Sequence, residues 1–172
     1  MAMIRMGPIG WESNFAKTTW DEMGHNIISH IIVSFDKSGV RSIQFGYVNN
    51  GTLAISKTFG SSAVGYNSRI VRLNHESEFV TGLSLEIYDN FITSLTFHTN
   101  QRNHEAVHLT FNTKFPKPKK IELHSGILEQ SEFGGFFGTY GLYELISIGF
   151  YVRLPLPDVK NIKKERVWHV AA

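Results

Sequence analysis

Apolar and polar residues alternate with a period of two along most of the chain. In the segment at residues 27–35, one face carries the apolar residues Ile27, Ile31, Val33 and Phe35, and on the other face Ile28 and Ile32 alternate with His30 and Ser34. Because successive side chains of a strand point to opposite faces, this period is that of a β-strand with one buried and one partly buried face. Similar patterns predict further strands at residues 42–47, 53–56, 69–73, 79–88, 91–99, 108–111, 120–124 and 145–152.

Short turn sequences separate these predicted strands. Residues 49–52 read NNGT, and Asp89-Asn90 links two strands directly. Asn, Asp and Gly tolerate the positive φ angles that tight hairpins require, so both places are predicted turns. No segment keeps a helical period for more than about two turns. The pattern therefore predicts an all-β sandwich, barrel or prism and disfavours βαβ cofactor folds.

Length and composition narrow the class of protein. A chain of 172 residues with 42% hydrophobic and 19% charged residues suits one globular domain with a substantial core. The absence of cysteine excludes disulfides and thiolate metal sites, and it fits a reducing compartment. A net charge of +2 is too small to indicate a nucleic-acid partner.

The opening residues and the hydropathy bear on location. The start, MAMIRMGPIGW, lacks the apolar core of a secretory signal, and no stretch of about 18 uncharged apolar residues is present. We therefore expect a soluble protein of the cytoplasm or the nucleus, without a membrane span. The sequon at Asn50 is then expected to be only a turn.

Three stretches carry a resemblance to a known family. They read MGPIGW near the start, EFVTGLSLEIYDNFITSLTFHTN at residues 78–100, and FGGFFGTYGLYELISIGFYV at residues 133–152. In order and spacing they resemble the jacalin-related lectins of plants, over residues 6–153. The resemblance implies a β-prism I fold, with three four-stranded Greek-key sheets around a pseudo-threefold axis. It also implies no catalysis, no cofactor, and a shallow sugar site of the mannose or glucose type.

The resemblance also implies where the sugar site lies. Family members bind sugar through an N-terminal glycine-rich loop and a GxxxD loop, whose acid accepts hydrogen bonds from sugar hydroxyls. When the GxxxD motif is aligned from its glycine at Gly141, the position of the acid falls on Leu145. When it is aligned from Ile148-Gly149 in the strand that follows, the acid falls on Ile146. The two alignments differ by one position, so the loop holds one extra residue. Glu144 is the carboxylate available in this loop, and Asn14 replaces a sugar-contacting glycine. The candidate carbohydrate-binding residues are Asn14, Gly141, Leu142, Tyr143, Glu144 and Leu145.

The resemblance leaves two possible functions, and the candidate site residues also have purely structural interpretations. The first is a lectin with an altered or weakened site, in plant defence, whose partners are glycans. The second is a jacalin-fold protein-interaction module that has lost sugar binding and restricts virus movement. The second rests on a weaker likeness, through the loop without its acid and the proline-containing tail, to single-domain jacalin proteins that restrict long-distance potyvirus movement. Glu144 could instead be a solvated edge residue, and Tyr143 could pack on neighbouring strands.

The sequence also leads to expectations about the domain limits, the oligomeric state and metal binding. Residues 1–153 form the predicted domain, and residues 154–172 a basic tail that is either flexible or a docking arm for a sheet edge or a partner. Homo-oligomers are expected, as is usual in the family. His104 and His108 are expected on one strand face, without a metal site. No motif indicates catalytic residues.

Overall fold

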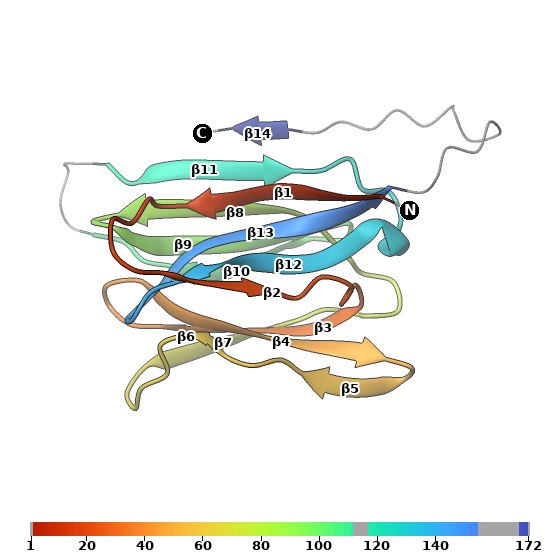
Figure 1. Cartoon of the computed structure of the whole chain (residues 1–172), viewed down its shortest axis with the longest axis horizontal. Helices are drawn as coiled ribbons and strands as arrows, with labels where there is room; N and C mark the ends of the chain where they lie inside the picture. Colours follow the sequence, from red (N-terminus) through yellow and green to blue (C-terminus); the bar gives the residue numbers. More distant parts are fainter. Residues whose placement is uncertain (1, 112–116, 155–168, 172) are drawn as a thin grey trace.

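The protein is built almost entirely from antiparallel β-strands. The computed structural model describes residues 2–111, 117–154 and 169–171. In this part of the chain the strands form three antiparallel sheets, and the only helical element is the short 3₁₀ turn η1 (Gln130–Glu132). The all-β prediction is confirmed (Figure 1).

Each sheet is named here by its strands in spatial order. Sheet A consists of β1 (Ala2–Gly10), β13 (Leu145–Leu154), β12 (Phe133–Tyr140) and β2 (Thr18–Asp21). Sheet B consists of β5 (Thr52–Ile55), β4 (Val40–Asn49), β3 (Ile28–Phe35) and β7 (Asn67–Arg72), with β6 (Phe59–Gly60) paired to β4. Sheet C consists of β10 (Asn103–His108), β9 (Phe91–Thr99), β8 (Val80–Tyr88), β11 (Lys119–His124) and β14 (His169–Ala171).

The three sheets repeat one Greek-key order. In sheet C, β8, β9 and β10 follow one another, and β11 returns to pair with β8. Sheet B repeats this order with β3, β4, β5 and β7, and sheet A repeats it with β12, β13, β1 and β2. The expected three Greek-key sheets are therefore present. Sheets B and C each carry one short strand beyond the expected four, because β6 pairs with β4 and β14 pairs with β11.

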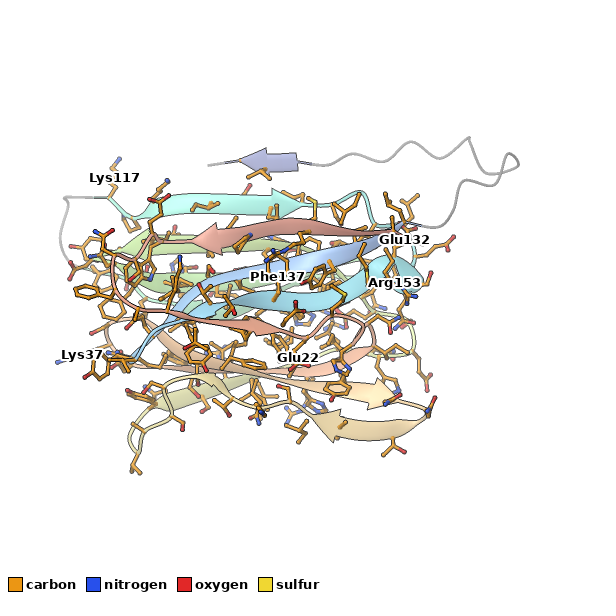
Figure 2. All side chains as sticks on the ribbon, viewed as in Figure 1. Glu22, Lys37, Lys117, Glu132, Phe137 and Arg153 are labelled. Atoms are coloured by element: carbon orange, nitrogen blue, oxygen red, sulfur yellow. The ribbon has the colours of Figure 1, made fainter. Side chains whose placement is uncertain are left out.

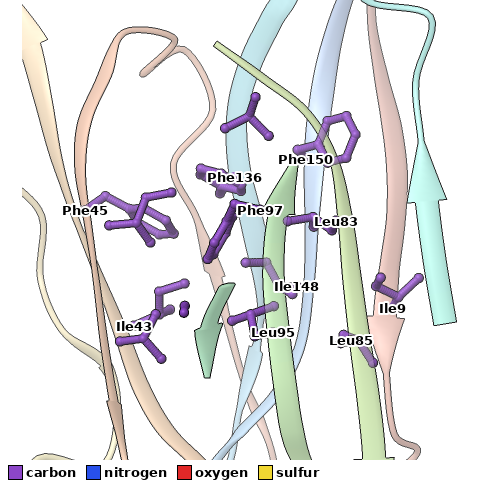
Figure 3. Close-up of a cluster of buried hydrophobic side chains, with 14 of the residues drawn as sticks. Ile9, Ile43, Phe45, Leu83, Leu85, Leu95, Phe97, Phe136, Ile148 and Phe150 are labelled. Carbon is purple, nitrogen blue, oxygen red and sulfur yellow. The ribbon is translucent and has the colours of Figure 1, made fainter. Parts of the chain in front are cut away.

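Aromatic side chains from all three sheets meet at the centre of the prism. Phe136 of sheet A stacks on Phe45 of sheet B at 4.7 Å between ring centroids and meets Phe97 of sheet C edge-on at 5.8 Å. All three are almost fully buried, and aliphatic residues from the three sheets surround them (Figure 3). Burial of this shared core holds the sheets, and hence the loops at their ends, in fixed relative positions.

Sequence patterns missed β1, β2, β6 and β12 and displaced β10. No strand is predicted over residues 133–140, but these residues form β12, in which Gly138 lets the Trp20 indole pack against the backbone. The strand predicted at residues 108–111 is wrong, since β10 ends at His108. A bulge at Ala106 also changes the facing of side chains: His104 pairs with Phe97 and His108 with Ser94, so the two histidines lie on opposite faces and not on one.

The tail was predicted to start at residue 154. Its residues 155–168 and 172 lie outside the described part of the chain. Residues 169–171 form β14 and extend sheet C at the β11 edge, with Val170 61% exposed. The domain boundary itself stays a prediction.

Candidate functional site

The β1–β2 connection (residues 11–17) and the β12–β13 loop (residues 141–144) start side by side at one end of the prism. Gly10 pairs with Ser147, and the Trp11 N–H donates to the Ile146 carbonyl at 3.2 Å. A Cβ on residue 10 would collide with the Ile146 carbonyl oxygen and lie 2.7 Å from the Ser147 Cα. Glycine at position 10 is therefore required for this close approach.

The extra residue of the β12–β13 loop is absorbed as a β-bulge. Thr139 pairs with Ser147 but Tyr140 pairs with Leu145, which leaves Ile146 as the additional residue on β13. The loop itself closes tightly, because the Gly141 N–H donates to the Glu144 carbonyl at 2.9 Å. The bulge thus places Glu144 in the turn and not on the strand.

Side chains of this loop point in two directions. Leu142 is 82% exposed and Tyr143 is 65% exposed, so both face solvent. Leu145 and Ile146, the two positions at which the family's acid was sought, are buried in the core. Leu145 belongs to the predicted sugar-binding set, but its side chain is not accessible to a ligand at the surface.

Glu144 lies between these two groups. Its carboxylate folds back over Gly141, and the residue is partly buried. Burial raises the pKa of Glu144 above its ordinary value, while the charge of Arg41 and a hydrogen bond from the Tyr143 backbone lower it by less. Glu144 is therefore a partly desolvated acceptor at the mouth of the loop.

Asn14, the remaining predicted site residue, is exposed in the β1–β2 connection. Its loop lies at the same end of the prism as residues 141–144 (Figure 1), and the β3–β4 turn that carries Lys37 lies at this end too (Figure 2). The structure thus brings the loop of Asn14 near Gly141, Leu142, Tyr143 and Glu144. Which of them bind sugar stays a prediction.

Arg41 on β4 is a component of this end that sequence patterns missed. Its Nη1 donates to the Tyr143 carbonyl at 2.8 Å, across 102 positions of sequence, and its Nη2 donates to the Asp36 carboxylate at 2.7 Å. Burial by itself raises the pKa of Asp36, but hydrogen bonds from Arg41 and the Ser38 and Gly39 amides bring that pKa below its ordinary value. No local signal marked Arg41, because its partners are distant in sequence.

Neither a metal site nor a membrane-spanning helix is found among the described residues. There, no three His, Asp or Glu side chains come together in a way that could hold a metal ion. In the same ranges, no helix has both the length and the apolar character needed to cross a bilayer.

The fold and the two loops at one end of the prism define a β-prism of the lectin type. The family model of the jacalin-like lectin domain matches residues 6–151. The chain belongs to the jacalin-like lectin family.

Its relatives include plant proteins of two kinds. The chain is 42% identical to jacalin-related lectin 24 of Arabidopsis thaliana over 154 residues, covering 87% of this chain. It spans 67% of the length of that relative and 62% of jacalin-related lectin 25. It is also 32% identical to the Arabidopsis thaliana protein RESTRICTED TEV MOVEMENT 1 over 173 residues, covering 94% of this chain and 95% of that protein.

Solved structures show the same fold. A mannose-specific jacalin-related lectin from Morus nigra, in complex with mannose, superposes with a TM-score of 0.65 at 20% identity, covering 90% of this chain and 96% of that chain. This likeness confirms the β-prism expectation.

Proposed function

We propose that the protein binds carbohydrate of the mannose or glucose type, at the end of the prism formed by residues 11–17 and 141–144. The observation that carries the proposal is the position of Glu144. The family's acid is replaced by buried Ile146 or Leu145, yet a carboxylate lies in the same turn, partly desolvated and next to solvent-facing Tyr143. A carboxylate in this position accepts hydrogen bonds from vicinal sugar hydroxyls, and an aromatic ring nearby covers the apolar face of a sugar. The mannose complex of the Morus nigra lectin supports mannose as the first ligand to test.

Titration calorimetry with methyl mannoside tests this proposal. We expect Glu144→Ala to weaken binding by about 1.5–3 kcal/mol, since a hydrogen bond to a charged group is lost. Glu105→Ala, an exposed carboxylate on sheet C, is the matched control and should bind as the unmutated protein does. Absence of heat from the unmutated protein at millimolar sugar would overturn the proposal.

A second function is favoured by one specific observation. The similarity to RESTRICTED TEV MOVEMENT 1 extends over 94% of this chain and 95% of that protein. This supports a protein-interaction module that restricts virus movement. Failure of sugar binding, together with restriction of potyvirus movement by the unmutated protein and by Glu144→Ala alike, would favour it over the lectin.

The setting of either function is part of the same proposal. We propose a role in plant defence, without catalysis or nucleic-acid binding, in the cytoplasm or nucleus. The lack of cysteine supports a reducing compartment. We also propose self-association, which light scattering tests; a monomer at high concentration would contradict it.

A further inference from the structure

The Arg41 side chain contacts segments of all three sheets. It lies near the start of β4 in sheet B, and its hydrogen bonds reach the Asp36 carboxylate in the β3–β4 turn and the Tyr143 carbonyl in the β12–β13 loop of sheet A. Its guanidinium also lies 5.1 Å from the ring centroid of Phe91, the first residue of β9 in sheet C, and 5.6 Å from that of Tyr66. One planar cation therefore contacts four separate segments at the end of the prism that carries the candidate site.

Arg41 is a largely buried cation whose neighbours hold it in place. Its side chain is only 12% exposed, and that of its partner Asp36 is 26% exposed. The Asp36 carboxylate is held in turn by the Ser38 N–H at 2.9 Å. Gly39 makes this packing possible, because a Cβ there would lie 2.6 Å from the Phe91 Cβ. A guanidinium that lies against two aromatic rings and donates through two of its nitrogens has little freedom to leave the Tyr143 carbonyl.

The contact with Tyr143 falls on the turn that presents Glu144. The Gly141 N–H to Glu144 carbonyl bond closes this turn from within, and Arg41 holds it from the side. Leu142 and Tyr143 are mostly exposed, so their side chains contribute little packing that would fix the turn. The position of the Glu144 carboxylate thus depends strongly on Arg41.

We propose that Arg41 is the positioning residue of the candidate sugar site: it holds the β12–β13 turn so that Glu144 faces the ligand. This inference rests on the proposed function, since it assigns a role within that same site. Arg41 itself does not touch the sugar. It acts through the Tyr143 carbonyl and through its positive charge near Glu144.

Two substitutions separate the effect of the Arg41 hydrogen bonds from the effect of its positive charge. Arg41→Met removes both the hydrogen bonds and the charge. Arg41→Lys keeps the charge but loses the planar guanidinium that donates to two acceptors at once. Arg72→Met, an exposed arginine on β7, is the matched control. Asp36→Asn is a milder variant that keeps the guanidinium but removes its ion-pair partner, in case Arg41→Met does not fold.

Three measurements follow the variants. Hydrogen exchange of the Gly141 amide should accelerate about tenfold in both Arg41 variants, because the turn opens more often. By NMR, the pKa of the Glu144 carboxyl should rise in Arg41→Met and stay near its original value in Arg41→Lys. Affinity for methyl mannoside should fall about tenfold in Arg41→Lys and more in Arg41→Met, with no change in Arg72→Met.

The outcomes distinguish this inference from the proposed function. Unchanged Gly141 exchange in a folded Arg41→Met, or in Asp36→Asn if Arg41→Met does not fold, would overturn the positioning role, whatever the sugar result. If the unmutated protein binds no sugar but Gly141 exchange and the Glu144 pKa change as expected, Arg41 holds the turn and the lectin proposal fails. Full affinity in Arg41→Lys despite faster exchange would also overturn the role.

Discussion

The Nε2 of His104 lies 2.7 Å from the carboxylate of Glu78, whose side chain is only 1% exposed. The Thr99 hydroxyl donates to the same carboxylate at 2.7 Å, and the Asn74 N–H donates to it at 3.0 Å. Glu78 precedes β8, Thr99 ends β9 and His104 lies in β10. One buried acid thus ties three segments of sheet C together.

Replacement of this acid should destabilise the fold. In Glu78→Gln the amide group cannot accept all of these hydrogen bonds, so we expect the free energy of unfolding to fall by about 2 kcal/mol at neutral pH. Urea denaturation measures the change. Glu76→Gln, an exposed neighbour, should leave the midpoint unchanged. Equal stability of Glu78→Gln and the unmutated protein would show that the network contributes nothing net.

Glu78 should also make the stability of the protein fall at low pH. Burial by itself raises the pKa of Glu78, but the hydrogen bonds from His104, Thr99 and Asn74 outweigh it and hold the pKa below 4.5. A carboxyl group whose pKa is lower in the folded than in the unfolded protein contributes its full stabilisation at any pH above its pKa in the unfolded protein. This stabilisation is lost as the pH falls through the pKa of the group in the folded protein. The stability difference between the unmutated protein and Glu78→Gln should therefore shrink below about pH 4.5. A constant difference down to the acid limit would contradict this.

Sugar affinity should depend on pH through Glu144. Because burial raises the pKa of this carboxyl, its charge is lost at a higher pH than that of an ordinary glutamate. Affinity for methyl mannoside should fall as pH drops through this raised pKa, and the profile of Glu144→Gln should be flat and low. Calorimetry between neutral pH and mild acid measures it. A parallel fall in both proteins would assign the effect to another group.

Gly10→Ala tests the close approach between the two loops. The new methyl group would meet the Ile146 carbonyl oxygen and the Ser147 Cα, so β1 must move away from β13. Overpacking of this kind costs about 1–3 kcal/mol, and the thermal midpoint should drop accordingly. Gly46→Ala, where the nearest atom is the His30 Cβ at 3.2 Å, should cost less. The opposite order would mean that backbone adjustment at Gly10 is easy.

Removal of β14 should hardly change stability. A chain ending at Leu154 loses a strand of three residues that pairs with residues 122–124 and leaves Val170 mostly exposed. The few hydrogen bonds of such a strand nearly balance the entropy of ordering it, so we expect a change within about 1 kcal/mol. Thermal unfolding checks this. A large loss would indicate that the tail is an integral part of sheet C.

Local pattern by itself determined the β-rich class and most strands of sheets B and C. These strands keep the period of two along much of their length and are bounded by turn residues, as at Asn50, Asp89 and Asn90, all three of which have positive φ. The three motifs near the start, at residues 78–100 and at residues 133–152 indicated the family and the loop of the candidate site. Where the alternation is broken by glycine, as in β12, or by a bulge, as at Ala106, the pattern failed because strand identity there depends on what packs against the backbone.

Only the tertiary structure decided how the site is built. The sequence places Glu144 in the loop, but the bulge at Ile146 and the burial of Leu145 arise from pairing with β12 and from the core. Arg41 and Tyr143 lie 102 positions apart and meet because three sheets share one end of a prism. Contacts of this kind leave no periodic signal in the chain, since they are set by packing between sheets and not by the order of neighbouring residues.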